Sequence, residues 1–476
     1  MSVAGTSVAG TSAAGPGAAE PRELRREIGP GSATVLVIAN MIGSGIFTTS
    51  GFILAELGSP QALLLCWLLG GLFALAGALC YGELGAMLPH AGGEYAYLRE
   101  AFGPLPAFLS GWVSLIVGFS APIAAAAIAF ATYLLGGAGE PWLVLGPAAR
   151  PWLTLSAVTV LACAAVVLLS LVHIHSLRLG QGVQNGLTAF KLGFIVVFIA
   201  AGLALGRGDL GHLDLALPDA GASGGGFAVA LIFVSFAYSG WNAAAYVGAE
   251  IRRPGRNLPL ALILGTLVVM LLYLLLNLVY VYALPPAAMD GMLEIGTGAA
   301  TALFGPGVGT LVGLAIALGL LSVMSAMIMA GPRVYFAMAR DGVFFRRFGS
   351  VHAERRTPVQ AIVLQALIAI GMILGAAYDA LLIYIGFTLT LSSLLTVAGL
   401  LRLRRRQPGW ARPYRTFGYP LTPLLFIGGS LWILLYTLAS RPVVGLYGLG
   451  TLLLGAILYR LLQSIVNAKA SHYVLR

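Results

Sequence analysis

The first long apolar segment of the chain contains the sequence Asn40-Met41-Ile42-Gly43-Ser44-Gly45-Ile46-Phe47-Thr48-Thr49. This segment, residues 31–57, is long enough to cross a bilayer, which takes about 20 residues of helix. Its middle nevertheless holds two glycines, and a glycine inside a helix costs about 1 kcal/mol relative to alanine. Open backbone at this depth is tolerated only where protein buries it or where it lines a cavity. The sequence therefore indicates either a close contact between helices or a break that forms a binding site.

A second apolar segment, residues 226–250, is interrupted in the same way by Ser239-Gly240-Trp241-Asn242. Aromatic residues flank this interruption, namely Phe236, Tyr238 and Tyr246. Two glycine-interrupted spans at matching places in two halves of a chain are the best sequence indication of a transporter's binding site. The pair therefore favours the binding-site interpretation over simple packing.

The composition is that of an integral membrane protein. Of the 476 residues, 59% are hydrophobic and only 9% are charged, and the mean hydropathy is +0.92. Soluble proteins carry about 25% charged residues. The net charge of +10 does not indicate a nucleic-acid partner, because nearly all of the basic residues lie in short loops between apolar segments. The three cysteines lie inside apolar segments and offer neither a disulfide framework nor a metal-binding spacing.

Twelve apolar segments are long enough to be membrane spans, and we number them 1 to 12 in chain order. Their ends carry glycine, proline and charged residues, which are the expected helix breakers. We expect residues 1–30 to be a disordered cytoplasmic N-terminus and residues 464–476 to be a cytoplasmic tail. The predicted spans are 31–57, 61–88, 104–136, 152–171, 183–206, 226–250, 257–284, 307–339, 358–377, 380–402, 419–439 and 442–463.

The distribution of Lys and Arg predicts the orientation. With the N-terminus in the cytoplasm, most of the 27 basic residues fall on the inside, and the outer loops hold only Arg150, Arg207 and Arg441. The positive-inside rule therefore places both ends in the cytoplasm of a multi-pass protein of the cell membrane. Spans 1 and 6 then run in opposite directions. We accordingly expect two inverted repeats, residues 31–206 and 226–403, followed by spans 11 and 12 at 419–463.

The two breaks offer the chemistry that an amino acid needs. Opening span 1 creates a helix N-terminus near Ile46, whose free N–H groups attract an anion such as a carboxylate. The opened spans also free carbonyls, which suit an ammonium group. Neither break contains Asp, Glu or Arg, so the site favours a substrate that is neutral overall. The residues that we expect to bind substrate are Ile42, Gly43, Ser44, Gly45, Ile46, Phe236, Tyr238, Ser239, Gly240, Trp241 and Asn242.

Several motifs, taken in order, resemble the amino acid–polyamine–organocation superfamily of amino acid permeases. The resemblance covers nearly the whole chain and is closest to the L-type branch. It implies an all-α fold of twelve transmembrane helices, with a five-plus-five inverted repeat and broken helices 1 and 6. The motifs are Ile42-Gly43-Ser44-Gly45-Ile46-Phe47, Tyr81-Gly82-Glu83-Leu84, Gly92-Gly93-Glu94-Tyr95, Phe236-Ala237-Tyr238-Ser239-Gly240-Trp241-Asn242, Gly331-Pro332-Arg333 and Arg340-Asp341-Gly342.

Lys191 is the charge that lies deepest in an apolar span. An ionisable residue inside the membrane is costly, which makes it a functional candidate. In relatives that resemble this chain, a lysine of the fifth span occupies the place of a sodium ion between spans 1 and 8. Ser322 and Ser325 of span 8 could line that place. The resemblance thus implies that transport does not need sodium.

The remaining polar residues have more ordinary interpretations. Glu83 and Glu94 could pair with Arg99 or Arg178 and form an inner gate, or they could be plain interfacial ion pairs. Tyr246 is a second candidate for this gate. His173 and His175 do not make a metal site, and we expect them in a solvated loop.

We predict a sodium-independent transporter of neutral L-amino acids that works by alternating access, with exchange as one mode. The alternatives are proton-coupled uptake of an amino acid or amine, a membrane enzyme, and a channel. An enzyme would need acids, His or Cys converging at one membrane depth, and the sequence offers no such set, so no enzymatic activity and no cofactor are expected. The expected partners are the substrate and membrane lipid. L-type relatives in animals attach a partner through an external cysteine, which is absent here, so no disulfide-linked partner is expected.

Overall fold

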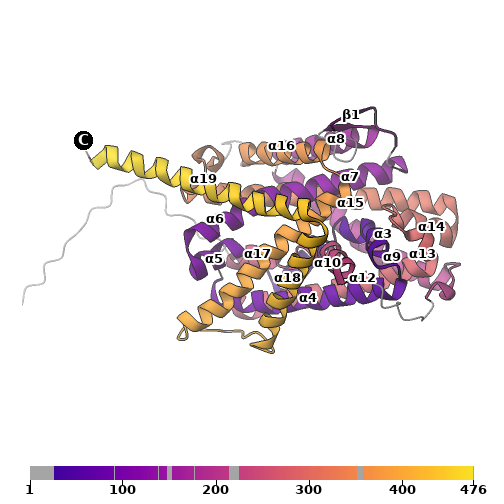
Figure 1. Ribbon diagram of the computed structural model, residues 1–476, viewed down its shortest axis with the longest axis horizontal. Coiled ribbons are helices and arrows are strands. Elements are labelled where there is room, and N and C mark those ends of the chain that lie inside the picture. Colours follow the sequence, from indigo (N-terminus) through magenta and orange to yellow (C-terminus); the bar gives the residue numbers. More distant parts are fainter. Residues whose placement is uncertain are drawn as a thin grey trace, which may run out of the picture.

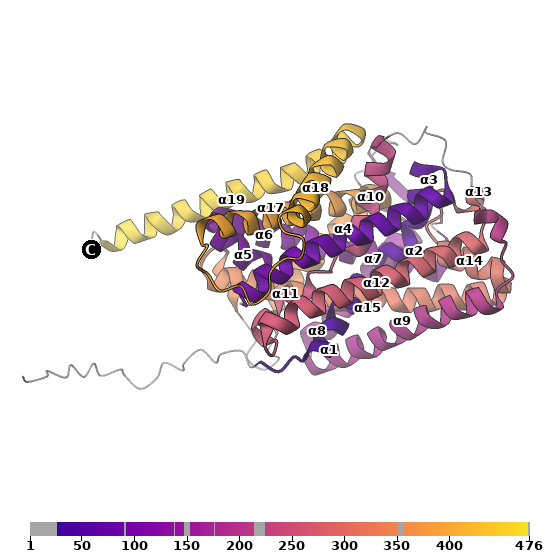
Figure 2. The same ribbon diagram turned by 90° about the horizontal axis from the view of Figure 1, so that it is seen from below.

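The structure is a computed structural model in which helices make up almost the whole fold (Figures 1 and 2). A short antiparallel hairpin joins spans 3 and 4 and pairs β1 (Leu143–Leu145) with β2 (Leu153–Leu155). The residues that the structure describes are 26–89, 92–137, 139–146, 153–175, 177–213, 224–350 and 357–474.

Helices occupy all twelve predicted spans, so the predicted fold class is confirmed. In the described part of the chain, ten helical stretches are apolar and long enough to cross a membrane. The apolar helices of spans 6 and 9 are shorter. The unbroken spans are α4 (Pro60–Met87), α8 (Ala157–His175), α9 (Leu177–Leu205), α12 (Pro254–Ala283), α15 (Pro306–Arg340), α16 (Val359–Gly375), α17 (Tyr378–Arg406), α18 (Leu421–Ser440) and α19 (Pro442–Val474). Span 3 comprises α6 (Pro104–Val113), the π-helix η1 (Ser114–Ser120) and α7 (Ala121–Leu135).

Spans 1 and 6 are broken where their glycines predict. In span 1, α1 (Pro30–Met41) ends before the glycines, and α2 (Gly45–Thr48) and α3 (Ser50–Leu57) complete the crossing. In span 6, α10 (Gly224–Tyr238) ends in a turn around Gly240, whose φ of 94° is open to glycine at no steric cost. The helical path then resumes in α11 (Ala243–Tyr246) and η3 (Gly248–Glu250).

The packing partners of the spans repeat between the two halves. Spans 1, 2, 6 and 7 pack on one another through α1 to α3, α4, α10 with α11, and α12. Spans 3, 4, 8 and 9 pack on one another through α7, α8, α15 and α16. Spans 5 and 10, α9 and α17, each touch both groups. Members of each group thus come in pairs five spans apart, as an inverted five-plus-five repeat requires.

The remaining elements cover the ends of this bundle. α5 (Glu94–Phe102) lies between spans 2 and 3, outside the membrane-spanning segments, at the end predicted to be cytoplasmic, which we call the inner end. α13 (Pro286–Met289) and α14 (Ile295–Phe304) lie between spans 7 and 8, and two short 3-10 helices are η2 (Leu210–Leu213) and η4 (Arg346–Gly349). α18 and α19 lie outside the repeats, and the end of α19 projects beyond the other helices (Figure 2).

Candidate functional site

The two breaks lie directly against each other, and glycines allow the close approach. A Cβ on Gly45 would lie 2.5 Å from the Cα of Ala237 in span 6, and one on Gly240 would lie 2.8 Å from the carbonyl oxygen of Asn40 in span 1. Both distances are too short for any larger residue. At Gly43, by contrast, the nearest atoms to such a Cβ are 3.8 Å and 4.0 Å away. Gly45 and Gly240 are thus required at close contacts, whereas a Cβ on Gly43 would make only ordinary van der Waals contacts.

The backbone at the start of α2 presents unused donors. In the part of the chain that the structure describes, the N–H groups of Ser44, Gly45 and Ile46 have no hydrogen-bond acceptor. The first N–H groups of a helix have no acceptor within that helix. Here the three residues that carry them are buried, so water does not replace the missing acceptor. Such a cluster of N–H groups can bind a carboxylate.

The opposite side of the break in span 1 is occupied by an ammonium group. The side chain of Lys191 reaches from α9 and donates hydrogen bonds to the carbonyls of Ala39, at 3.1 Å, and Ile42, at 2.5 Å. Lys191 is 1% exposed, and its stem passes 3.6 Å from the position of a Cβ on Gly319 in span 8. Among the described residues no carboxylate pairs with it. The lysine therefore links span 5 to span 1 through carbonyl oxygens, which are also the ligands that sodium takes.

The span 8 hydroxyls have other partners. We expected Ser325 to serve Lys191, but its hydroxyl lies 2.9 Å from Nε2 of His173. His173 belongs to α8 and is buried, so the expected solvated loop was wrong for this residue. Ser322 contacts the hydroxyl of Thr188 at 3.2 Å. Span 8 thus reaches spans 4 and 5 by hydroxyl contacts of its own rather than through the ammonium group.

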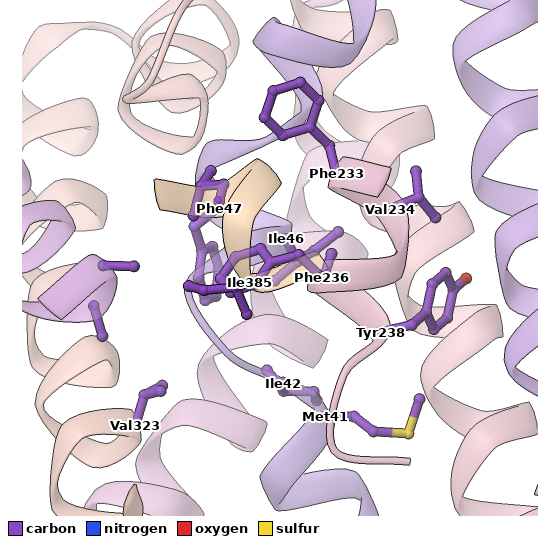
Figure 3. Close-up of a cluster of buried hydrophobic side chains, with 14 of the residues drawn as sticks. Met41, Ile42, Ile46, Phe47, Phe233, Val234, Phe236, Tyr238, Val323 and Ile385 are labelled. Carbon is purple, nitrogen blue, oxygen red and sulfur yellow. The ribbon is translucent and has the colours of Figure 1, made fainter. Parts of the chain in front are cut away.

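The aromatic residues of span 6 divide into two sets. Phe236 belongs to a cluster of buried side chains that includes Ile46 and Ile385, and the ring of Tyr238 points away from these residues (Figure 3). The hydroxyl of Tyr238 donates to the carbonyl of Trp67 in span 2. The ring of Trp241 packs edge-on against Tyr81 and Phe426, with centroids 4.6 Å and 6.5 Å away. Of the three, Phe236 therefore lies beside the break in span 1, and the contacts of Tyr238 and Trp241 are those of packed core residues.

A tyrosine of span 7, which the sequence gives no reason to select, ties the two breaks together. The hydroxyl of Tyr273 lies 2.7 Å from the carbonyl of Met41 and 3.1 Å from that of Ala237. At the outer end, three more tyrosines, one each from spans 3, 7 and 10, hold span 1. Tyr133 contacts the carbonyl of Phe47 at 2.5 Å, Tyr378 contacts the hydroxyl of Thr48 at 3.0 Å, and Tyr280 lies 3.5 Å from the carbonyl of Ile46. Lone tyrosines in apolar helices show no pattern in a single sequence.

The inner acids have different partners from those expected. Glu83 is fully buried and binds the Arg404 guanidinium of span 10 at 2.8 Å and 2.6 Å. It also accepts from the N–H and the hydroxyl of Thr416, at 2.7 Å and 2.8 Å. Pairing with Arg99 is therefore wrong for Glu83, and the side chain of Arg178 is outside the described residues. Glu83 instead fastens span 2 to span 10 and to the loop after it.

The segment that carries Gly92 and Glu94 contacts the inner half of span 6, where Tyr246 lies. Glu94 accepts a hydrogen bond from Nδ2 of Asn242 at 2.9 Å, and the N–H of Gly92 donates to the carbonyl of Tyr246 at 3.2 Å. The N-terminal segment contacts the end of the same span, because Ile28 and Ile251 form a parallel bridge. The inner half of span 6 is thus in contact both with the segment before α5 and with the segment before α1.

Comparison with known proteins places nearly all of these elements in one family. A family model described as "Amino acid permease" matches residues 28–448. The mouse (Mus musculus) protein "b(0,+)-type amino acid transporter 1" is 31% identical over 429 residues, which cover 88% of this chain and 84% of that protein. The mouse "Large neutral amino acids transporter small subunit 2" is 32% identical over 447 residues, 92% of this chain and 81% of that protein. The human (Homo sapiens) b(0,+)-type protein is 31% identical over 435 residues, 89% and 85%.

Proposed function

The chain belongs to the amino acid permease family, and from this we propose that it transports amino acids across the membrane by alternating access. The relatives named as amino acid transporters support this proposal over an enzyme or a channel. The observation that carries it is the set of unpaired N–H groups at Ser44, Gly45 and Ile46, buried where the two broken spans meet. These donors would hold the α-carboxylate of the substrate.

We further propose neutral L-amino acids as the substrates. Neither break contains an acidic or a basic residue, so dipoles rather than full charges would meet the zwitterion. The span 6 backbone around Ser239 and Gly240 would face the ammonium group, and Phe236 with Ile46 would contact the side chain. Of the three glycines of the two breaks, Gly43 is the one where an added Cβ would meet its neighbours only at ordinary van der Waals distance, so we place the ligand beside it. Trp241 and Asn242 would support the site from behind through span 2 and α5.

The position of Lys191 supports transport without sodium. Its ammonium group already takes the carbonyls of Ala39 and Ile42, so a coupling cation has no place there. Without such a cation we propose exchange of one amino acid for another as the mode of transport. The basic inner loops support an orientation with both ends in the cytoplasm. We propose no disulfide-linked partner, because Cys66 and Cys80 are buried in α4 and Cys163 lies within α8.

Exchange in vesicles tests the proposal. Purified protein would be reconstituted into liposomes that are either empty or loaded with unlabelled leucine, and uptake of labelled leucine measured in sodium and in choline buffers. We expect uptake only in loaded vesicles, equal in the two buffers, and competition by neutral L-amino acids but not by their methyl esters, which lack the carboxylate. A strict sodium requirement would contradict the role given to Lys191. Accumulation in empty vesicles driven by a pH gradient would favour proton-coupled uptake instead.

A further inference from the structure

Glu94 is a buried carboxylate whose hydrogen-bonding partners are all neutral. It is 6% exposed. Its Oε1 accepts from the hydroxyl of Tyr81 at 2.7 Å and from Asn242 at 2.9 Å, and its Oε2 accepts from the hydroxyl of Ser392 at 2.8 Å. These donors come from spans 2, 6 and 10. Within the described part of the chain no Lys, Arg or His forms an ion pair with it.

The segment that carries Glu94 is shaped to dock on the inner half of span 6. Gly92 and Gly93 have φ angles of 110° and 50°, which favour glycine. The Gly92 N–H donates to the carbonyl of Tyr246, and a Cβ on Gly93 would lie 2.9 Å from the Tyr246 ring. Two glycines thus permit the contact, and the residue after them reaches Asn242 at the break itself.

This burial makes Glu94 sensitive to protons. Loss of hydration raises the pKa of the Glu94 carboxyl above its ordinary value, and the hydrogen bonds from Tyr81, Ser392 and Asn242 offset the effect only in part. The titratable groups that face it are the phenols of Tyr81, Tyr97 and Tyr246, which are neutral at physiological pH. In an open conformation, where the segment leaves span 6, water would restore the ordinary pKa.

We propose that Glu94 is the proton-binding switch of the inner gate. It takes up a proton from the cytoplasm when residues 92–94 dock on span 6, and it releases the proton when they separate. In the docked acid, Oε2–H donates to Ser392, whose hydroxyl turns to accept, while Oε1 still accepts from Tyr81 and Asn242. Protons bind more tightly to the state with the higher pKa, so acid favours the closed inner end and alkali favours the open one. The inference rests on the proposed function, because it concerns the gate of that substrate site.

A distance measurement without substrate tests the switch. Spin labels would be placed on cysteines at Arg99 of α5 and Arg252 at the end of span 6, both exposed, after replacement of Cys66, Cys80 and Cys163. In liposomes free of amino acid, we expect the distance between labels to lengthen in one step as pH rises. Glu94→Gln keeps the shape of the protonated acid and should hold the short distance at every pH. Glu100→Gln, which changes an exposed acid on the same helix, should titrate like the unmodified protein.

A second variant, which leaves the Glu94 carboxylate in place, provides a test that does not depend on Glu94→Gln. Ser392→Ala removes a hydrogen bond from both forms of Glu94, but the bond to the charged carboxylate is the stronger one, so the midpoint should move up, by about one pH unit at most. A constant distance in the unmodified protein, or an unchanged pH response in Glu94→Gln, would overturn the switch. Uptake of labelled leucine into the same liposomes distinguishes a failure of the proton switch from a failure of the proposed transport function. If the distance titrates as expected but no variant takes up an amino acid, the proposed function fails and the proton switch stands.

Discussion

Nζ of Lys191 lies 2.5 Å from the carbonyl oxygen of Ile42, the residue directly before the first glycine of the span 1 break. An α-helix leaves the carbonyls of its last turn without partners, and in a membrane core water cannot serve them. One charged side chain from α9 therefore stabilises the opened backbone and, through it, the end of α1. The cost of burying the ammonium group is offset by the two carbonyls, so each side of this contact depends on the other.

Replacing Lys191 with methionine tests this dependence. Methionine keeps most of the volume but leaves the Ala39 and Ile42 carbonyls unpaired, at a cost of about 1 to 3 kcal/mol each. We expect exchange to slow at least about tenfold at one face of the membrane, with substrate affinity less affected, because the balance between inner and outer conformations shifts. Uptake and efflux would be timed from both sides of oriented vesicles. Normal rates from both faces would show that the charge has no mechanistic role.

The two glycines of the first break should respond differently to substitution. Alanine at Gly45 would collide with the backbone of Ala237 and should destabilise the protein, so it cannot report on binding. Valine at Gly43 has room for its Cβ but would crowd the free N–H groups beside it. We expect Gly43→Val to fold and to lose substrate affinity, measured by the concentration of leucine that half-inhibits labelled uptake.

Gly193→Val is the matched control for this experiment. Gly193 lies on α9 with nothing within 4 Å of its Cβ position, so the substitution should leave both stability and affinity unchanged. Equal affinities in Gly43→Val and in the control, at equal thermal stability, would remove the carboxylate site from this break.

Substitutions at Trp241 and Phe236 should distinguish a residue that packs the core from one that recognises the substrate. The Trp241 ring fills space between spans 2 and 11, where Gly77 leaves room for it, so Trp241→Ala should lower stability by about 3 to 5 kcal/mol. Phe236→Ala should instead change which amino acids compete for uptake, because Phe236 lies in the cluster with Ile46 (Figure 3). Thermal unfolding and a competition series would be measured on both variants. A changed competition profile in Trp241→Ala, with that of Phe236→Ala unaltered, would reverse the assignment.

The breaks and spans could be predicted because their causes are local. A glycine weakens the helix in which it lies, and basic residues beside a span indicate its orientation, so both can be interpreted from a few neighbouring residues. The partners of Glu83, Ser325 and His173 could not be predicted, because each of these hydrogen bonds joins residues 152 or more positions apart in the sequence. Several loops offered equally suitable charges for Glu83. The direction in which the Trp241 side chain points depends on the space left by the missing side chain of Gly77. That space is defined only once the helices are packed together. The role of each predicted binding residue remains a prediction for the experiments above.

Tyr273 provides the last prediction. Its hydroxyl contacts the carbonyls of Met41 and Ala237 and so joins the two broken spans at the level of their breaks. Tyr273→Phe removes one oxygen atom and leaves the ring in place against Trp67 and Tyr238. We expect stability to fall by only about 1 kcal/mol, whereas leucine affinity should fall further, because the breaks no longer hold a fixed relation to each other. Tyr280→Phe is the matched control from the same helix, since its hydroxyl lies 3.5 Å from the nearest carbonyl and makes a weaker bond. Equal losses of affinity in the two variants, measured by half-inhibition of labelled leucine uptake, would mean that Tyr273 is one packing residue among several and that the link lies elsewhere.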